Sequence, residues 1–189
     1  MVQRVEEYVL IPKPTFQKEV IQEVVETVIQ EFSREVMERG VSINLETGAL
    51  KGEGDFFIDK ALLARALFYI LENSIEAVAR IPIGKKGKVV KVSLLGDKEN
   101  IGVSISDRGE GIPKKNMDRI FDPFFSTRPD RVGLGLTFAK RVVEEQGGNI
   151  QVESRLKRGT TITLTFPKDR RRILRREQIS PGAMGENID

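Results

Sequence analysis

The sequence predicts an α+β protein, a two-layer α/β sandwich in which a mixed, mostly antiparallel sheet packs on three main helices. Two observations lead to this prediction. In three segments, apolar residues recur at helical spacing, and short β-rich runs lie between these segments. Two of the β-rich runs flank the turn-like sequence "GDKEN", which favours a hairpin. Helices that are segregated from an antiparallel sheet bury one face each against it, so two layers around one core are expected.

The first helix is expected over residues 16–39. Apolar side chains recur every four residues from Val20 to Val36, which is typical of an amphipathic helix, and Gly40 follows as a stop signal. Thr15 precedes this pattern and is the expected N-cap residue. Such a helix needs a sheet against which to bury its apolar face.

The remaining elements follow from the same signals. A second helix is expected over 60–79, before the break at Pro82 and Gly84, and a third over 133–146. The predicted strands are 41–45, 55–58, 88–95, 101–106, 149–154 and 160–166. The segment 107–131 lacks periodicity and is expected to form a loop that can act as a lid.

Composition indicates a globular domain with appended ends. The 189 residues are 39% hydrophobic and 31% charged, and no apolar run approaches the ~18 residues of a membrane span. Without cysteine, the chain has no disulfide framework and no thiolate metal site. With no secretory signal in view either, a cytoplasmic location is expected.

Two appendages are expected around a domain at 16–167. Residues 1–15 contain two prolines and predict a linker, with a short strand possible at 8–11. The segment 168–189 holds six basic and four acidic residues and is expected to be a basic, flexible tail. The body is then nearly neutral, so no nucleic-acid partner is expected, although "KDRRRILRREQ" leaves a nucleic-acid or anionic-lipid patch as an alternative.

An asparagine lies inside the second helix. Asn73 belongs to a stripe with Tyr69, Glu76 and Arg80 that borders the apolar face. Asparagine is a mediocre helix former, so it is either solvated or has a partner, and its side-chain oxygen is a good ligand for Mg²⁺. Because Mg²⁺ takes its other ligands from water and phosphates, one protein oxygen suffices.

Two glycine-containing motifs can approach a ligand closely. In "ISDRGEGIP", Asp107 ends a strand, and a carboxylate there can accept the amine proton of adenine while repelling the carbonyl of guanine. In "RVGLGLTF", Gly133 and Gly135 open a helix whose N-terminal N–H groups suit an anion. Taken alone, each motif is equally compatible with a structural turn. The loop between them carries Phe121, Phe124 and Phe125, expected as packing anchors, and several cations.

Together these motifs resemble the catalytic and ATP-binding domain of sensor histidine kinases, which has the Bergerat fold that gyrase, the ninety-kilodalton heat-shock chaperone and mismatch-repair proteins share. The resemblance covers about residues 16–167. It rests on "ILENSIEAV" as the asparagine box, "DRGEGI" and "GLGL" as the glycine boxes, "FDPFFSTR" as the phenylalanine box and "GTTITLTFP" as the closing strand. The phenylalanine box discriminates, because the glycine boxes occur throughout the superfamily.

The resemblance implies roles for individual residues. Asn73 is the expected Mg²⁺ ligand, Asp107 contacts the adenine amine with support from Gly111 and Thr160 through water, and Gly133 to Leu136 lie at the phosphates. Asn73, Glu76 and Arg128 are the expected catalytic residues. The full expected ATP site is Asn73, Asp107, Gly109, Gly111, Ile112, Phe124, Thr127, Arg128, Arg131, Gly133, Leu134, Gly135, Leu136 and Thr160.

Three positions depart from the family pattern. Tyr69 stands where the family often has a further asparagine and the hydrolysing members have a glutamate base, so water activation is poorly supported. Arg131 replaces a glycine and either stiffens the lid or adds a cation at the phosphates. Arg128 replaces a common lysine, which keeps the charge but changes the hydrogen-bond geometry.

The chain contains no histidine, although the family phosphorylates one. The expected function is therefore that of a phosphoryl-donating domain of a two-component sensor kinase, which binds Mg²⁺·ATP and transfers the γ-phosphate to a histidine on a separate dimerisation domain. That domain and a response regulator are the expected partners, and the isolated domain is expected to be monomeric with little turnover. The alternatives are an anti-sigma-type serine protein kinase and a non-catalytic nucleotide-sensing interaction module.

Overall fold

The computed structural model describes residues 11–50, 55–82 and 88–168. Predictions for 1–10, most of the C-terminal tail and Gly84 therefore concern residues outside the described part. The helices are α2 (Ile21–Glu31), α3 (Ser33–Arg39), α4 (Lys60–Ala79) and α5 (Gly135–Glu145), with the 3-10 helix η1 (Lys114–Arg119). The strands are β1 (Gln17–Val20), β2 (Ser42–Leu50), β3 (Asp55–Ile58), β4 (Val89–Gly96), β5 (Asn100–Asp107), β6 (Asn149–Arg155) and β7 (Gly159–Pro167).

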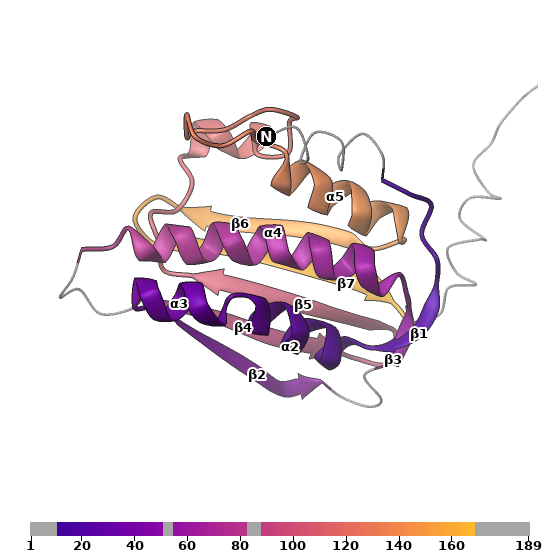
Figure 1. Cartoon of the computed structure of the whole chain (residues 1–189). Helices are drawn as coiled ribbons and strands as arrows, with labels where there is room; N and C mark the ends of the chain where they lie inside the picture. The colour runs from indigo at the N-terminus through magenta and orange to yellow at the C-terminus, as the bar shows by residue number, and fades with distance from the viewer. Residues whose placement is uncertain (1–10, 51–54, 83–87, 169–189) are drawn as a thin grey trace, which may run out of the picture.

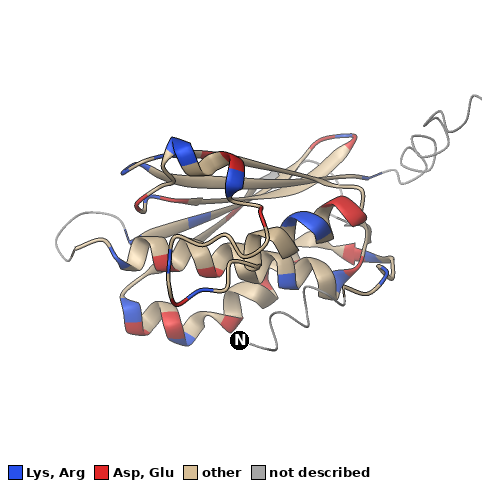
Figure 2. Cartoon of the chain, turned by 90° about the horizontal axis from the view of Figure 1, so that it is seen from above, with Lys and Arg blue, Asp and Glu red and all other residues tan. Residues whose placement is uncertain are grey.

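The main sheet has the strand order β2-β4-β5-β7-β6. Strands β2 and β4 are parallel, and every other neighbouring pair in this sheet is antiparallel. The α helices lie together on one face of the sheet, which gives two layers (Figures 1 and 2). The predicted two-layer α+β sandwich with a mixed, mostly antiparallel sheet is therefore confirmed.

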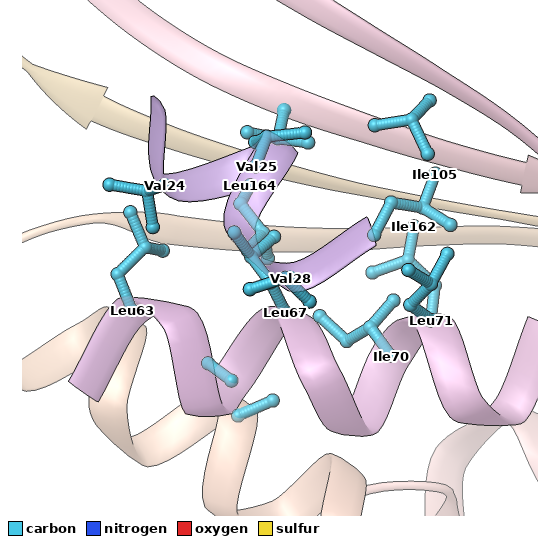
Figure 3. Packing of buried hydrophobic residues seen from close by; sticks show 14 of the residues in the cluster. Val24, Val25, Val28, Leu63, Leu67, Ile70, Leu71, Ile105, Ile162 and Leu164 are labelled. Atoms are coloured by element: carbon cyan, nitrogen blue, oxygen red, sulfur yellow. The ribbon is translucent and has the colours of Figure 1, made fainter. Parts of the chain in front are cut away.

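The core lies between α4 and the centre of the sheet. Leu67 and Ile70 of α4 lie beside Leu164 and Ile162 of β7, and Leu63 lies beside Val24 of α2, as Figure 3 shows. Each of these side chains is at most 4% exposed, and burying an aliphatic side chain of this size stabilises the fold by about 1.5–3 kcal/mol. Val25 and Val28 of α2 belong to the same cluster, and Val28 lies beside Leu67 (Figure 3). This packing fixes α4 against β5 and β7, the three elements that carry Asn73, Asp107 and Thr160 of the site described below.

Helix α4 begins and ends where the sequence predicts. The Asp59 carboxylate caps it by accepting from the Leu62 N–H at 3.0 Å. The same carboxylate accepts from the Thr15 N–H at 2.7 Å, and the Asp59 N–H donates to Gln146 Oε1 at 2.7 Å. Asp59 thus joins the start of α4 to the incoming chain and to the end of α5.

The first predicted helix is wrong in two places. Residues 17–20 form strand β1, which pairs with β3, so Thr15 does not cap a helix. The helix then breaks at Phe32, whose ring is 2% exposed and stacks on Phe68 with centroids 4.6 Å apart. Pairing with a distant strand and burial of one ring outweigh local helical preference here. Gly40 ends the helical region, as predicted, and it does so in the left-handed conformation.

The outer surface carries both signs of charge. Lys and Arg residues are interspersed with Asp and Glu residues along the helices (Figure 2). Several are paired one helical turn apart, including Arg34 with Glu38 and Arg141 with Glu145. In the described ranges, no helix combines the length and the apolar character needed to cross a membrane.

Candidate functional site

A cavity of about 460 Å³ opens between α4, the end of β5, the segment 110–134 and the start of α5. Most of the residues that the sequence indicated line it. These are Asn73, Asp107, Gly111, Ile112, Thr127, Arg128, Arg131, Gly133, Leu134, Gly135, Leu136 and Thr160. Three others, Glu76, Gly109 and Phe124, are not part of the lining. The structure thus brings together residues that lie as far apart in the sequence as Asn73 and Thr160, while their roles stay predictions.

Asn73 reaches the cavity because α4 buries the residues on either side of its stripe. Ile70 and Ser74 are 0% and 4% exposed, whereas Asn73 is half-buried and lines the cavity. Its side-chain amide therefore faces the open space rather than bulk solvent. An amide oxygen in that place is a suitable single ligand for Mg²⁺.

Asp107 supplies a buried carboxylate to the cavity wall. It is 6% exposed, and burial raises its pKa because the charged form loses water. Hydrogen bonds from the Gly109 N–H, the Thr160 N–H and the Ser74 hydroxyl act against this rise in pKa. The Gly109 bond is 2.7 Å long and ends on Oδ1. The carboxylate is thus held by the protein on one side while it borders the cavity, where it can accept from a ligand N–H.

The loop after Asp107 is fastened to the β6–β7 turn. Gly111 has φ +65°, and a Cβ there would overlap the Arg155 carbonyl, so only glycine fits. The Ile112 N–H donates to Ser154 Oγ at 2.8 Å, and that oxygen lies 2.9 Å from Thr160 Oγ1. These contacts explain why Thr160, far along the chain, shares the wall with Asp107.

Gly109 has a packing role rather than a place at the wall. A Cβ at this residue would collide with the backbone and Cβ of Ala77 on α4. The glycine therefore lets the loop pass directly over the helix. This close approach sets the position of Asp107 relative to Asn73.

The start of α5 forms the far wall. Gly133 has φ +75°, and a Cβ there would overlap the Phe125 backbone, whereas Gly135 packs on the Tyr69 ring. No side chain caps this helix and its first turn has no acidic residue. Its free N–H groups and the positive end of its dipole therefore suit a negatively charged ligand at the cavity.

The phenylalanines of the loop differ in their surroundings. The Arg119 guanidinium lies 4.5 Å from the Phe125 ring centroid, and Lys140 Nζ lies 5.2 Å from that of Phe121. Both rings thus anchor the loop, and Phe125 also lines the cavity. Phe124 is 63% exposed with φ +65°, so it neither anchors the loop nor lines the cavity.

Glu76 lies behind the cavity wall. It is 6% exposed and pairs with the guanidinium groups of both Arg128 and Arg131. The two arginines line the cavity, whereas Glu76 is not among the lining residues. Glu76 thus meets the cavity through the arginines with which it pairs, and its expected catalytic role stays a prediction.

Several lining residues were not part of the predicted site. Tyr69, Glu72, Ser74, Asn116, Phe125 and Leu156 are among them. Glu72 lies three residues after Tyr69 and four before Glu76 on α4, so helical spacing could have indicated it. Leu156 lies in the β6–β7 turn, and no local signal in the sequence relates that turn to α4.

Among the described residues, no group of three His, Cys, Asp or Glu side chains could hold a metal ion by itself. Among the lining residues of α4, Asn73 offers an uncharged amide oxygen, while the Glu72 carboxylate is paired with Arg131. This donor set fits a hard cation that shares a bound phosphate and water molecules, which is how Mg²⁺ is usually held.

Comparisons with known proteins agree with this geometry. Residues 58–170 match the family of histidine kinase-, DNA gyrase B-, and HSP90-like ATPases. The chain is 30% identical to sporulation kinase D of Bacillus subtilis over 173 residues, which cover 87% of this chain and 32% of that protein. It is 36% identical to the sensor histidine kinase ZraS of Escherichia coli over 109 residues, which cover 58% of this chain and 22% of that protein.

Solved structures show the same fold. The nucleotide-free catalytic domain of the histidine kinase ThkA superposes with a TM-score of 0.69 at 26% identity, covering 82% of this chain and 98% of that domain. Full-length ShkA in complex with AMPPNP gives a TM-score of 0.74 at 20% identity, covering 87% of this chain and 34% of that protein. The chain thus spans a third or less of the curated relatives named above but nearly all of a solved catalytic domain. It belongs to the family of histidine kinase-, DNA gyrase B-, and HSP90-like ATPases, as the catalytic and ATP-binding domain of a histidine kinase.

Proposed function

We propose that the chain binds Mg²⁺·ATP in this cavity and transfers the γ-phosphate to a histidine on a separate domain of a two-component sensor kinase. The observation that carries the proposal is the convergence of three groups on one cavity. These are the buried Asp107 carboxylate, the Asn73 amide and the uncapped start of α5 at Gly135. Residues 16–167 would form this catalytic domain, between a linker and a tail.

Asp107 selects the base in this proposal. Its carboxylate accepts the amine N–H of adenine, with Thr160 and Gly111 beside it at the wall. Guanine presents a carbonyl oxygen at that place and would be repelled by an ionised carboxylate. Burial strengthens the discrimination, because water cannot enter to solvate the mismatched pair.

The glycine turn and α5 receive the phosphates. The backbone from Gly133 to Leu136 lines the cavity and has few side-chain atoms to block a close approach. Asn73 would hold the Mg²⁺ together with phosphate oxygens and water. When bound, the cation neutralises phosphate charge, which is the main electrostatic requirement of phosphoryl transfer.

The acceptor histidine comes from outside the chain, because none of the 189 residues is a histidine. A neutral imidazole is already a nucleophile, so the donor domain needs to position the phosphate rather than to supply a base. This agrees with Glu76 lying behind two arginines instead of at the cavity surface. The histidine-bearing dimerisation domain and a response regulator are the proposed partners, the isolated chain is a proposed monomer, and its cytoplasmic location stays a prediction.

The test is transfer in trans. The chain is incubated with γ-labelled ATP, Mg²⁺ and the histidine-bearing helical domain of the same kinase. We expect label on that domain whose bond is labile in acid and stable in alkali, as for a phosphoramidate, and no label with Asn73→Ala. Acid-stable label would instead support a serine kinase, and tight ATP binding without transfer would support an interaction module.

A further inference from the structure

Six basic side chains lie beside the cavity without lining it. Each belongs to the segment after Asp107 or to the β6–β7 turn, and each lies within two residues of a residue that does line the cavity. All six are exposed, and none of them forms an ion pair within the described part of the chain. We refer to these residues as the basic rim, which consists of Arg108, Lys114, Lys115, Arg155, Lys157 and Arg158.

The two segments that carry the basic rim are held against each other by their backbones. The Lys157 N–H donates to the Glu110 carbonyl at 2.6 Å. A Cβ at Gly159 would overlap the Asp107 carbonyl and would come within 2.8 Å of the Arg108 Cα, so these two strands of chain pass in direct contact. The fold therefore gathers like charges, which repel each other, in one place beside the cavity. A negatively charged ligand that approaches this place reduces the repulsion.

The cavity wall itself gives little net attraction for an anion. Its ionisable lining residues in the described ranges are balanced in charge, with Glu72, Asp107 and Glu110 against Arg80, Arg128 and Arg131. Two of these arginines are also paired with Glu76, which lies outside the lining. By contrast, the ranges 108–116 and 155–158 hold six basic residues and a single carboxylate, Glu110. The positive charge that an approaching nucleotide meets here thus comes from the basic rim.

We propose that the basic rim is an encounter surface, which draws the anionic nucleotide to the cavity and sets its association rate without contacting it once it is bound. The proposal rests on the proposed function, because it needs a nucleotide as the ligand. Charges of one sign beside a cleft increase the association rate of an oppositely charged ligand by about 10-fold to 10³-fold. Their attraction extends over about 8 Å at physiological ionic strength, so side chains outside the lining act on a ligand that is still in solvent.

The test measures association and dissociation separately, by stopped-flow fluorescence of the whole chain with a fluorescent, non-hydrolysable ATP analogue and Mg²⁺. The variant carries both Lys114→Glu and Arg158→Glu. At an ionic strength of about 0.01 M, where screening is weak, it should lower the association rate constant by about tenfold. At about 1 M the loss should shrink to less than about twofold. The dissociation rate constant should change by less than about twofold at both ionic strengths.

Two controls separate the basic rim from other effects of charge. Lys98→Glu makes the same change of charge at an exposed residue of the β4–β5 turn, at the opposite end of β5 from Asp107. It should change the association rate constant by less than about twofold at either ionic strength. A fluorescent adenosine carries no phosphate charge, so it should associate equally fast with the wild type and the double variant. Equal urea midpoints of unfolding show that the variants keep the fold.

Four results would overturn the proposal. The double variant associates as fast as the wild type at low ionic strength, or it weakens binding only through faster dissociation, as a surface in direct contact with the bound nucleotide would. Alternatively, Lys98→Glu slows association as much as a single reversal in the basic rim, which would make net charge the cause. In the last case the wild-type chain does not bind the nucleotide at all. Only this last result also contradicts the proposed function, so the two failures are distinguishable.

Discussion

Replacing Asp107 by asparagine tests the most specific contact of the proposed ATP site. The carboxylate is 6% exposed, and Oδ1 already accepts from the Gly109 N–H at 2.7 Å. An amide has one oxygen and one donor group. If its oxygen faces the adenine amine, its NH₂ faces the N–H groups of the loop, and if it is flipped, its NH₂ faces the adenine amine. Either orientation sets two donors against each other.

The loss is that of one charge-assisted hydrogen bond, about 1.5–3 kcal/mol, which corresponds to about tenfold to about 150-fold weaker ATP binding. A GTP analogue should lose nothing, because the new NH₂ can donate to the guanine carbonyl. We would measure both affinities by competition against a fluorescent nucleotide. Asp118→Asn, an exposed carboxylate in η1, is the matched control. Unchanged ATP affinity in Asp107→Asn with an intact fold would refute the reasoning.

Three further predictions concern Mg²⁺, stability and pH. Asn73→Ala should abolish most of the increase in ATP affinity that Mg²⁺ causes in calorimetry. Asn116 is another amide that lines the cavity, and Asn116→Ala should retain this increase. An equal increase in both variants would contradict the Mg²⁺ role of Asn73. Asp59→Ala should lower the free energy of unfolding in urea by about 1–2 kcal/mol because α4 loses its cap, and Asp59→Asn should lower it little; equal losses would exclude capping as the cause. Because burial raises the pKa of Asp107, the folded protein binds its proton more tightly than the unfolded chain does. The free energy of unfolding of the wild type, relative to that of Asp107→Asn, should therefore decrease as the pH rises from the ordinary aspartate pKa through the raised pKa of Asp107. Urea titrations in which this difference increases over the same pH range would contradict the prediction.

Local signals were enough to predict most of the fold. Helix α4 begins after Asp59 and ends at Ala79 as predicted, because its cap and its apolar face are both local properties of the sequence. The hairpin of β4 and β5 and the final strands follow from alternation and turn residues in the same way. Strand β1 was missed because its extended backbone depends on pairing with β3, almost forty residues later.

Site residues could be predicted from the sequence only where the residue type and its local position suggest a binding role. Asp107 and the glycines at the start of α5 were predicted as site residues. A carboxylate at the end of a predicted strand and glycines at the start of a predicted helix can both be recognised in the sequence. Glu76 was placed on the correct stripe of α4, but no periodicity shows that Arg128 and Arg131 cover it. Phe124 and Phe125 are adjacent residues of the same type, so the sequence does not distinguish them. The conformation of the loop backbone places Phe125 at the cavity and leaves Phe124 exposed.

The most direct test of the whole account is a calorimetric titration of the wild-type chain with non-hydrolysable ATP and GTP analogues, each with and without Mg²⁺. The account predicts that the ATP analogue binds, that the GTP analogue binds far more weakly, and that Mg²⁺ increases the affinity for the ATP analogue. Equal affinity for both analogues, or no binding of either, would contradict an adenine-selective, Mg²⁺-dependent site in this cavity.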